Sequence, residues 1–180
     1  MIKVFTGPMF SGKTNGLINV YDNMWNKDII QCFKPKIDSR DFGFIKSRNN
    51  KTEIKAALIE DLKELKEKLQ NNVTTIFIDE FQFLQGDVSI ISYMSLYEDK
   101  DFYISGLAMT SELEPFGLMP QIMAIADEIV FYEATCFYCN KSAKFTLFLG
   151  EKTDAILVGN SEYVPTCGKC YTKQKTICQK

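Results

Sequence analysis

Gly7-Pro8-Met9-Phe10-Ser11-Gly12-Lys13-Thr14 is the stretch that decides the fold. It fits the phosphate-binding pattern G-x-x-x-x-G-K-[ST] without a mismatch, and it lies between a predicted strand at residues 2–6 and a predicted helix at residues 13–26. The glycines allow a tight turn whose N–H groups converge on phosphate oxygens, and the helix directs its positive end at the same anion. The whole stretch is therefore the candidate ATP-binding loop. Lys13 would bind the β- and γ-phosphates, and the Thr14 hydroxyl would bind Mg²⁺.

Strands and helices alternate along most of the chain. Further strands are predicted at residues 29–34, 73–79, 102–107 and 129–132, and further helices at 60–70, 87–97 and 118–126. This alternation predicts an α/β fold, with a P-loop NTPase-like parallel sheet that carries helices on both faces. Residues 36–52 are polar and interrupted by Gly43 and Asn49-Asn50, so they are predicted to form a long exposed loop.

Two acids, Asp79 and Glu80, follow the apolar run Ile76-Phe77-Ile78. Ligands of open α/β sheets bind at the carboxyl ends of the strands, so both acids fall where the phosphate loop also lies. Asp79 is the candidate ligand of Mg²⁺. Because the chain has no histidine, Glu80 is the candidate general base that accepts the proton of an attacking hydroxyl. Alternatively, such a pair can be a solvated cap at the end of a strand.

Four of the six cysteines form two C-x-x-C pairs. Cys136 with Cys139 and Cys167 with Cys170 could supply the four thiolates of a closed, structural Zn²⁺ site. Redox dithiols or buried free thiols are the alternatives. The change in pattern near residue 134 predicts a P-loop ATP-binding domain at 1–134 and a small zinc-ribbon-like β domain at 135–180.

The composition excludes several classes of protein. A formal net charge of -2 does not favour a nucleic-acid partner, and no apolar run is long enough to predict a membrane span. Without histidine there is no Ser-His-Asp or Cys-His nucleophile. The amino-terminal residues do not read as a secretory signal, so a reducing, cytoplasmic location is expected.

These motifs occur in an order that resembles the type II thymidine kinase family. The order is the loop GPMFSGKT, Asp79-Glu80 followed by Phe-Gln-Phe, a Gly-Leu followed by Pro-Phe-Gly, and the two C-x-x-C pairs. The resemblance covers essentially the whole chain. It implies transfer of the ATP γ-phosphate to the 5′-hydroxyl of thymidine, with deoxyuridine also accepted. It further implies a homotetramer that thymidine triphosphate inhibits as the end product.

The resemblance also assigns roles to individual residues. It implies that Glu80 is catalytic and that Arg40, in Asp38-Ser39-Arg40, lies near the phosphates. A lasso-like loop at residues 158–163 would cover the base, largely through main-chain hydrogen bonds. The nucleoside-binding residues that the resemblance implies are Met9, Gln82, Phe83, Leu107, Phe116, Val158, Gly159 and Tyr163.

Four positions depart from the family pattern. Phe81 replaces a small residue, Ala108 an Asp, Ser111 an aromatic residue and Arg48 a His. All four fall on the nucleoside side of the expected site, so a related deoxynucleoside kinase with altered base preference is one alternative. A non-enzymatic zinc-ribbon binding protein with a vestigial nucleotide site is the other.

Overall fold

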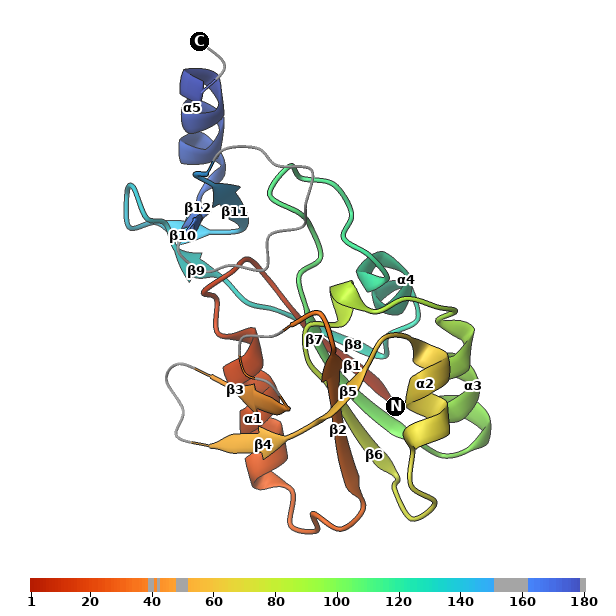
Figure 1. The fold of residues 1–180 in the computed structure, drawn as a ribbon. Helices are drawn as coiled ribbons and strands as arrows, with labels where there is room; N and C mark the ends of the chain where they lie inside the picture. The colour runs from red at the N-terminus through yellow and green to blue at the C-terminus, as the bar shows by residue number, and fades with distance from the viewer. Residues whose placement is uncertain (39–40, 42, 48–51, 151–161, 179–180) are drawn as a thin grey trace.

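The computed structural model describes residues 1–38, 41, 43–47, 52–150 and 162–178. Its centre is a six-stranded parallel sheet (Figure 1). The strands lie in the order β5 (Ala57–Ile59), β2 (Ile30–Pro35), β6 (Thr75–Ile78), β7 (Asp101–Gly106), β1 (Ile2–Thr6) and β8 (Glu128–Phe131). This is the predicted α/β architecture, and each predicted strand is present to within a few residues.

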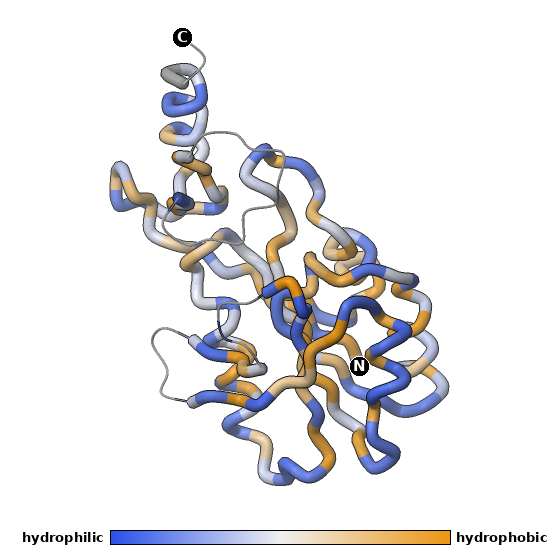
Figure 2. Tube along the Cα trace, in the orientation of Figure 1, coloured by the Kyte–Doolittle hydropathy of each residue, from blue (hydrophilic) through white to orange (hydrophobic). Residues whose placement is uncertain are grey.

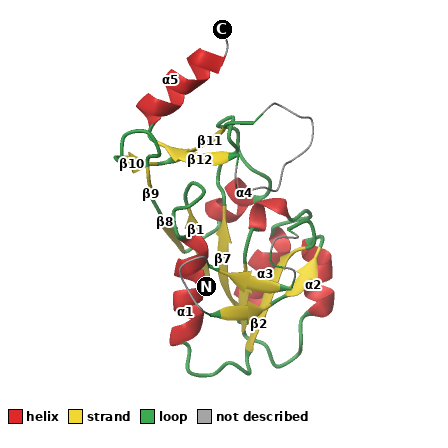
Figure 3. Ribbon diagram, turned by 60° about the vertical axis from the view of Figure 1, so that its left-hand side comes forward, coloured by secondary structure: helices red, strands yellow, loops and turns green. Residues whose placement is uncertain are grey.

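Helices cover both faces of the sheet (Figure 3). On one face, α1 (Lys13–Asn23) packs on Phe77 through Leu17. On the other, α2 (Leu62–Lys68), α3 (Ser89–Tyr97) and α4 (Met119–Ala124) pack on Ile76 and Ile78. Since successive side chains of a strand point to opposite faces, β6 contributes to both cores and is buried along its whole length. Figure 2 shows hydrophobic residues recurring along the central strands.

The prediction of one long exposed loop at 36–52 was wrong in part. The strands β3 (Phe44–Lys46) and β4 (Glu53–Lys55) pair as an antiparallel hairpin beside α1. Their central residues, Ile45 and Ile54, are 1% and 3% exposed, and both pack into the core that contains Leu17. Burial of one apolar side chain from each strand therefore folds a segment whose composition is otherwise that of a loop.

The carboxyl-terminal part contains short strands and a helix. The strands are β9 (Ala134–Thr135), β10 (Ser142–Ala143), β11 (Phe145–Phe148) and β12 (Tyr163–Thr166), and the helix is α5 (Gly168–Cys178). The sequence predicted a small β domain here and did not predict α5. Leu147, Val164 and Tyr171 form a small separate core with Phe145. The division into 1–134 and 135–180 stays a prediction. Among the described helices, none is long and apolar enough to cross a bilayer.

Candidate functional site

The candidate ATP-binding loop connects β1 to α1 at the carboxyl edge of the sheet. Gly7 and Gly12 have φ angles of 149° and 89°, which side chains rarely adopt, and a Cβ on Gly7 would lie 2.2 Å from the Tyr132 carbonyl oxygen. Lys13 Nζ reaches back across the loop and donates to the Pro8 carbonyl oxygen at 2.8 Å. The backbone of residues 7–14 is therefore bent as the motif requires, and the Lys13 side chain lies across the loop.

The loop also offers an unsatisfied hydroxyl to an anion. Ser11 Oγ is buried and has no hydrogen-bond partner among the described residues. Buried polar atoms are nearly always paired, so an orphaned hydroxyl in this loop fits a ligand that accepts hydrogen bonds there. Together with the amino-terminal end of α1, this fits the phosphates of a nucleotide.

Thr14 and Asp79, the two predicted ligands of Mg²⁺, lie together, while binding of the ion stays a prediction. Thr14 Oγ1 donates to the two Asp79 carboxylate oxygens at 3.3 and 3.2 Å. Burial, reinforced by the charge of Glu80, raises the pKa of Asp79 to about 7. A hydroxyl and a buried carboxylate are suitable oxygen ligands for a hard divalent cation, and such a cation would favour the ionised acid.

Glu80 is held in a strained conformation directly after β6. Its φ is 53°, in the left-handed region, and it begins the single turn η1 (Phe81–Phe83). Glu80 Oε2 accepts a hydrogen bond from Gln82 Nε2 at 2.6 Å, and Gln82 Oε1 accepts one from the Leu107 N–H at 3.0 Å. Gln82, which is 3% exposed, thus links the candidate base to the end of β7. The sequence predicted a nucleoside contact for Gln82 and gave no sign of this second role.

Other predicted nucleoside residues converge on the same edge. The rings of Phe83 and Phe116 meet edge to face with their centroids 5.4 Å apart. The Met9 N–H donates to Thr146 Oγ1 at 3.0 Å, which joins the phosphate loop to β11. Sequence reasoning missed Thr146, because no motif includes it.

The predicted lasso-like loop is only partly visible. Tyr163 starts β12, and its ring packs at a tilt against that of Phe148 with centroids 4.9 Å apart. Arg40, Val158 and Gly159 lie outside the described residues. Their predicted roles, like the main-chain contacts of the loop, stay predictions.

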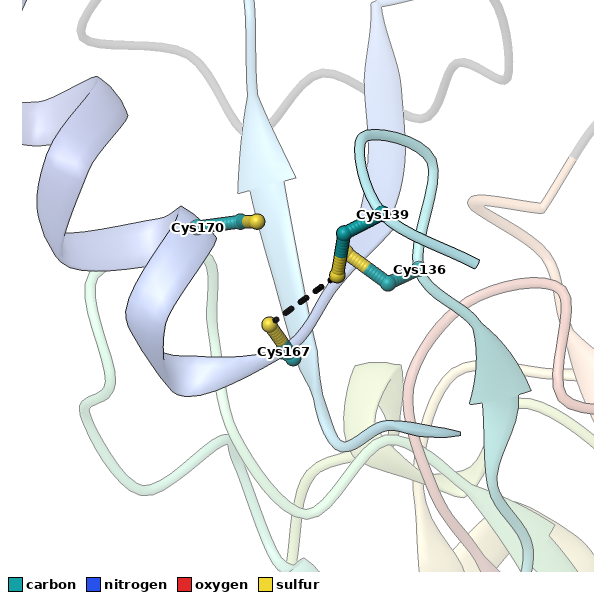
Figure 4. A group of neighbouring side chains, drawn as sticks. All are labelled: Cys136, Cys139, Cys167 and Cys170. Atoms are coloured by element: carbon teal, nitrogen blue, oxygen red, sulfur yellow. Dashed lines mark hydrogen bonds between the residues drawn. The ribbon is translucent and has the colours of Figure 1, made fainter. Parts of the chain in front are cut away.

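The four predicted metal-binding cysteines form one cluster (Figure 4). Their Sγ atoms lie within 4.8 Å of one another, and Cys139 Sγ is 3.6 Å from Cys167 Sγ. Sulfurs of a tetrahedral zinc site are about 3.8 Å apart, given a Zn–S bond of about 2.3 Å. Although burial acts to raise it, backbone N–H donors lower the pKa of Cys136 to about 6.

The convergence of four sulfurs fits a closed zinc site better than two independent redox dithiols. All four thiols are free rather than joined in disulfides. Cys32 is buried in the core between the sheet and α1, apart from this cluster.

Comparisons with known proteins support the same interpretation. A family model described as "Thymidine kinase" matches residues 1–171. A protein of Mycoplasma mobile named thymidine kinase is 34% identical over 176 residues, which cover 95% of this chain and 86% of the relative. A protein of Pseudothermotoga lettingae with the same name is 29% identical over 177 residues, which cover 96% and 95%.

Proposed function

The chain belongs to the thymidine kinase family, and from this premise we propose that it transfers the γ-phosphate of ATP to the 5′-hydroxyl of thymidine. The observation that carries the proposal is the convergence of Lys13, Thr14, Asp79 and the Gln82-bonded Glu80 at one edge of the sheet. One side of this arrangement suits a triphosphate, and the other suits a hydroxyl that must lose a proton.

Each residue of the site has a separate role in the proposed reaction. Lys13 and the N–H groups of residues 7–14 bind the β- and γ-phosphates, with Lys13 Nζ turning from the Pro8 carbonyl to phosphate oxygens. Thr14 and Asp79 would hold Mg²⁺, which would supply positive charge to the phosphates. Glu80 accepts the proton of the 5′-hydroxyl group. The oxygen of that hydroxyl group bonds to the γ-phosphorus as the bond from the γ-phosphorus to ADP breaks.

The nucleoside is proposed to bind beside Glu80. Phe83 and Phe116 supply an aromatic wall that suits a flat pyrimidine, and Met9 of the phosphate loop would lie beside the base. Residues 158–163, including Val158, Gly159 and Tyr163, would close over the base, and Arg40 would approach the phosphates. Deoxyuridine, which lacks only the 5-methyl group, should also be accepted, because one methyl group changes affinity modestly.

The remaining expectations are also part of the proposal. Zn²⁺ at the four cysteines would hold the carboxyl-terminal segment together without taking part in the reaction. The family resemblance supports a cytoplasmic homotetramer that thymidine triphosphate inhibits.

A phosphorylation assay with thymidine and Mg-ATP tests the proposal. The wild type should form thymidine monophosphate, and Lys13→Ala should lose at least about 10²-fold in rate, because a preorganised positive charge at the transferred phosphate is removed. Lys63→Ala, at a side chain that is 81% exposed on α2, is the matched control and should be as active as the wild type. Equal rates for wild type and Lys13→Ala would refute the assigned site. Salt-sensitive DNA binding without ATP turnover would favour the non-enzymatic alternative.

A further inference from the structure

Residues 108–116 lie between β7 and α4 and form a hairpin, here called the 108–116 hairpin. Hydrogen bonds within the hairpin stabilise its turn. At its base, the Phe116 N–H donates to the Ala108 carbonyl oxygen at 3.0 Å. At its tip, the Thr110 hydroxyl oxygen accepts from the N–H groups of Glu112 and Glu114, both at 3.2 Å. The Thr110 N–H also donates to the Glu114 carbonyl oxygen at 2.9 Å. A hairpin bonded at both ends tends to move as a unit, so a constraint on the tip also constrains the base.

The base of the hairpin rests on the residue that holds Glu80. Leu107, just before the hairpin, donates its N–H to Gln82 Oε1. Gly117, just after it, has a φ of 52° and lies so close to Gln82 that a Cβ there would be 2.0 Å from the Gln82 carbonyl oxygen. Phe116 meanwhile contacts Phe83. The position of the hairpin therefore sets one wall of the proposed nucleoside site.

Helix α5 contacts the tip of the hairpin. The Tyr171 hydroxyl donates to the Ser111 carbonyl oxygen at 2.6 Å, and Lys175 Nζ forms an ion pair with the Glu112 carboxylate at 2.5 Å. Tyr171 is 8% exposed, packs against Phe145, and lies next to the cluster residue Cys170. Beyond these contacts α5 projects away from the rest of the chain (Figure 1). Its first turns thus join the cysteine cluster to the hairpin tip.

We propose that Tyr171 and Lys175 are positioning residues, which fix the 108–116 hairpin and through it the nucleoside wall at Phe116 and Leu107. This inference rests on the proposed function. It gives the carboxyl-terminal helix a role in thymidine binding, although neither residue touches the reacting atoms. The ATP side of the site, at residues 7–14, is built on β1 and α1 rather than on the hairpin and should be unaffected.

Tyr171→Phe is the first test, because it keeps the packed ring and removes only the hydroxyl. The KM for thymidine should rise roughly 3- to 10-fold, as expected for one lost hydrogen bond, while kcat stays within about two-fold. The KM for ATP and the melting temperature should not change. Tyr97→Phe, at a tyrosine 76% exposed on α3, is the matched control and should leave both KM values unchanged.

The ion pair allows a test by charge reversal. Lys175→Glu and Glu112→Lys should each raise the KM for thymidine, and the double variant should restore it, because the pair is re-formed in the opposite sense. A role in stability alone would lower the melting temperature and the apparent kcat while leaving both KM values unchanged. That pattern, or unchanged KM values for thymidine in all these variants, would overturn the proposal.

Hydrogen exchange supplies a readout that does not depend on activity. In Tyr171→Phe combined with Lys175→Met, the Phe116 amide should exchange at least about five-fold faster than in the wild type, because the hairpin opens more often. Amides of β6 should be unchanged. Unchanged exchange at Phe116 would refute the positioning role even if the kinase assay itself failed. Faster exchange without thymidine phosphorylation in the wild type would instead refute the proposed function.

Discussion

Replacing Asp79 with Asn should stabilise the magnesium-free protein, and more strongly as the pH rises. The Asp79 carboxylate is 6% exposed, and its neighbour Glu80 carries the same charge. Asn is nearly isosteric and can still accept the hydrogen bond of Thr14 through its amide oxygen. The substitution therefore removes a buried negative charge and little else.

The sign and size of the effect follow from the pKa. Burial raises the pKa of Asp79 from 3.8 in the unfolded chain to about 7 in the fold. The folded state therefore binds the proton of Asp79 more tightly than the unfolded chain does. The stability that this proton contributes is fully present below pH 3.8, the pKa in the unfolded chain, and is lost as the pH rises through about 7. Three pKa units correspond to about 4 kcal/mol in total, of which about 3 kcal/mol fall between about pH 5 and about pH 9.

Urea unfolding of wild type and Asp79→Asn at a series of pH values measures this difference. Buffers free of Mg²⁺ and nucleotide keep the site in the state that the structure describes. The free energy of unfolding of Asp79→Asn minus that of the wild type should grow with pH and level off above about pH 8. Asp28→Asn, at an exposed carboxylate, controls for the loss of one negative charge. A difference that is constant or shrinks with rising pH would show that Asp79 is not a strained buried acid.

Three further predictions concern the base, the cysteine cluster and the core. Glu80→Gln should keep its affinity for ATP while phosphoryl transfer falls roughly 10²- to 10⁴-fold, and near-normal turnover would remove Glu80 from the role of base. About one zinc per chain should be found by elemental analysis, retained in Cys32→Ser and lost in Cys136→Ser; the reverse pattern would overturn the ligand assignment. Phe81→Ala should lower the free energy of unfolding by about 3–5 kcal/mol without changing the ratio of kcat/KM for thymidine over deoxycytidine, and a changed ratio would place Phe81 in the pocket.

The parts of the site that the sequence predicted are those encoded in short windows. Residues 7–14 lie within one turn of backbone, and Asp79 and Glu80 are adjacent, so their chemistry can be inferred without knowing the fold. The cysteine pairs are similar, because each C-x-x-C already places two thiolates together. The sheet was predictable for a related reason: buried parallel strands such as β6 appear as continuous apolar runs.

What the sequence did not predict depends on contacts between distant segments. The bonds of Gln82 to Glu80 and Leu107 exist only because β6 and β7 are neighbours in the sheet. Helix α5 is rich in lysine and threonine and shows no apolar stripe, and Tyr171 is the one buried residue among those of the helix whose side chains the structure describes. Nor could the pattern distinguish the β3 and β4 hairpin from a loop, since each strand buries a single isoleucine.

Three of the four departures from the family pattern have a physical explanation that favours an unchanged preference for thymidine; the fourth, Arg48, lies outside the described residues. Phe81 is fully buried in the core on the α2 and α3 side of the sheet, so its larger ring fills the interior and not the nucleoside pocket. Ala108 and Ser111 act in the 108–116 hairpin through carbonyl oxygens, which accept from the Phe116 N–H and the Tyr171 hydroxyl. Any residue supplies a carbonyl oxygen, so the side chains at these two positions can change while the hairpin keeps its shape. The groups proposed to face the substrate, Glu80 and the Phe83–Phe116 wall, match those that the family resemblance implies, and base selectivity should follow them.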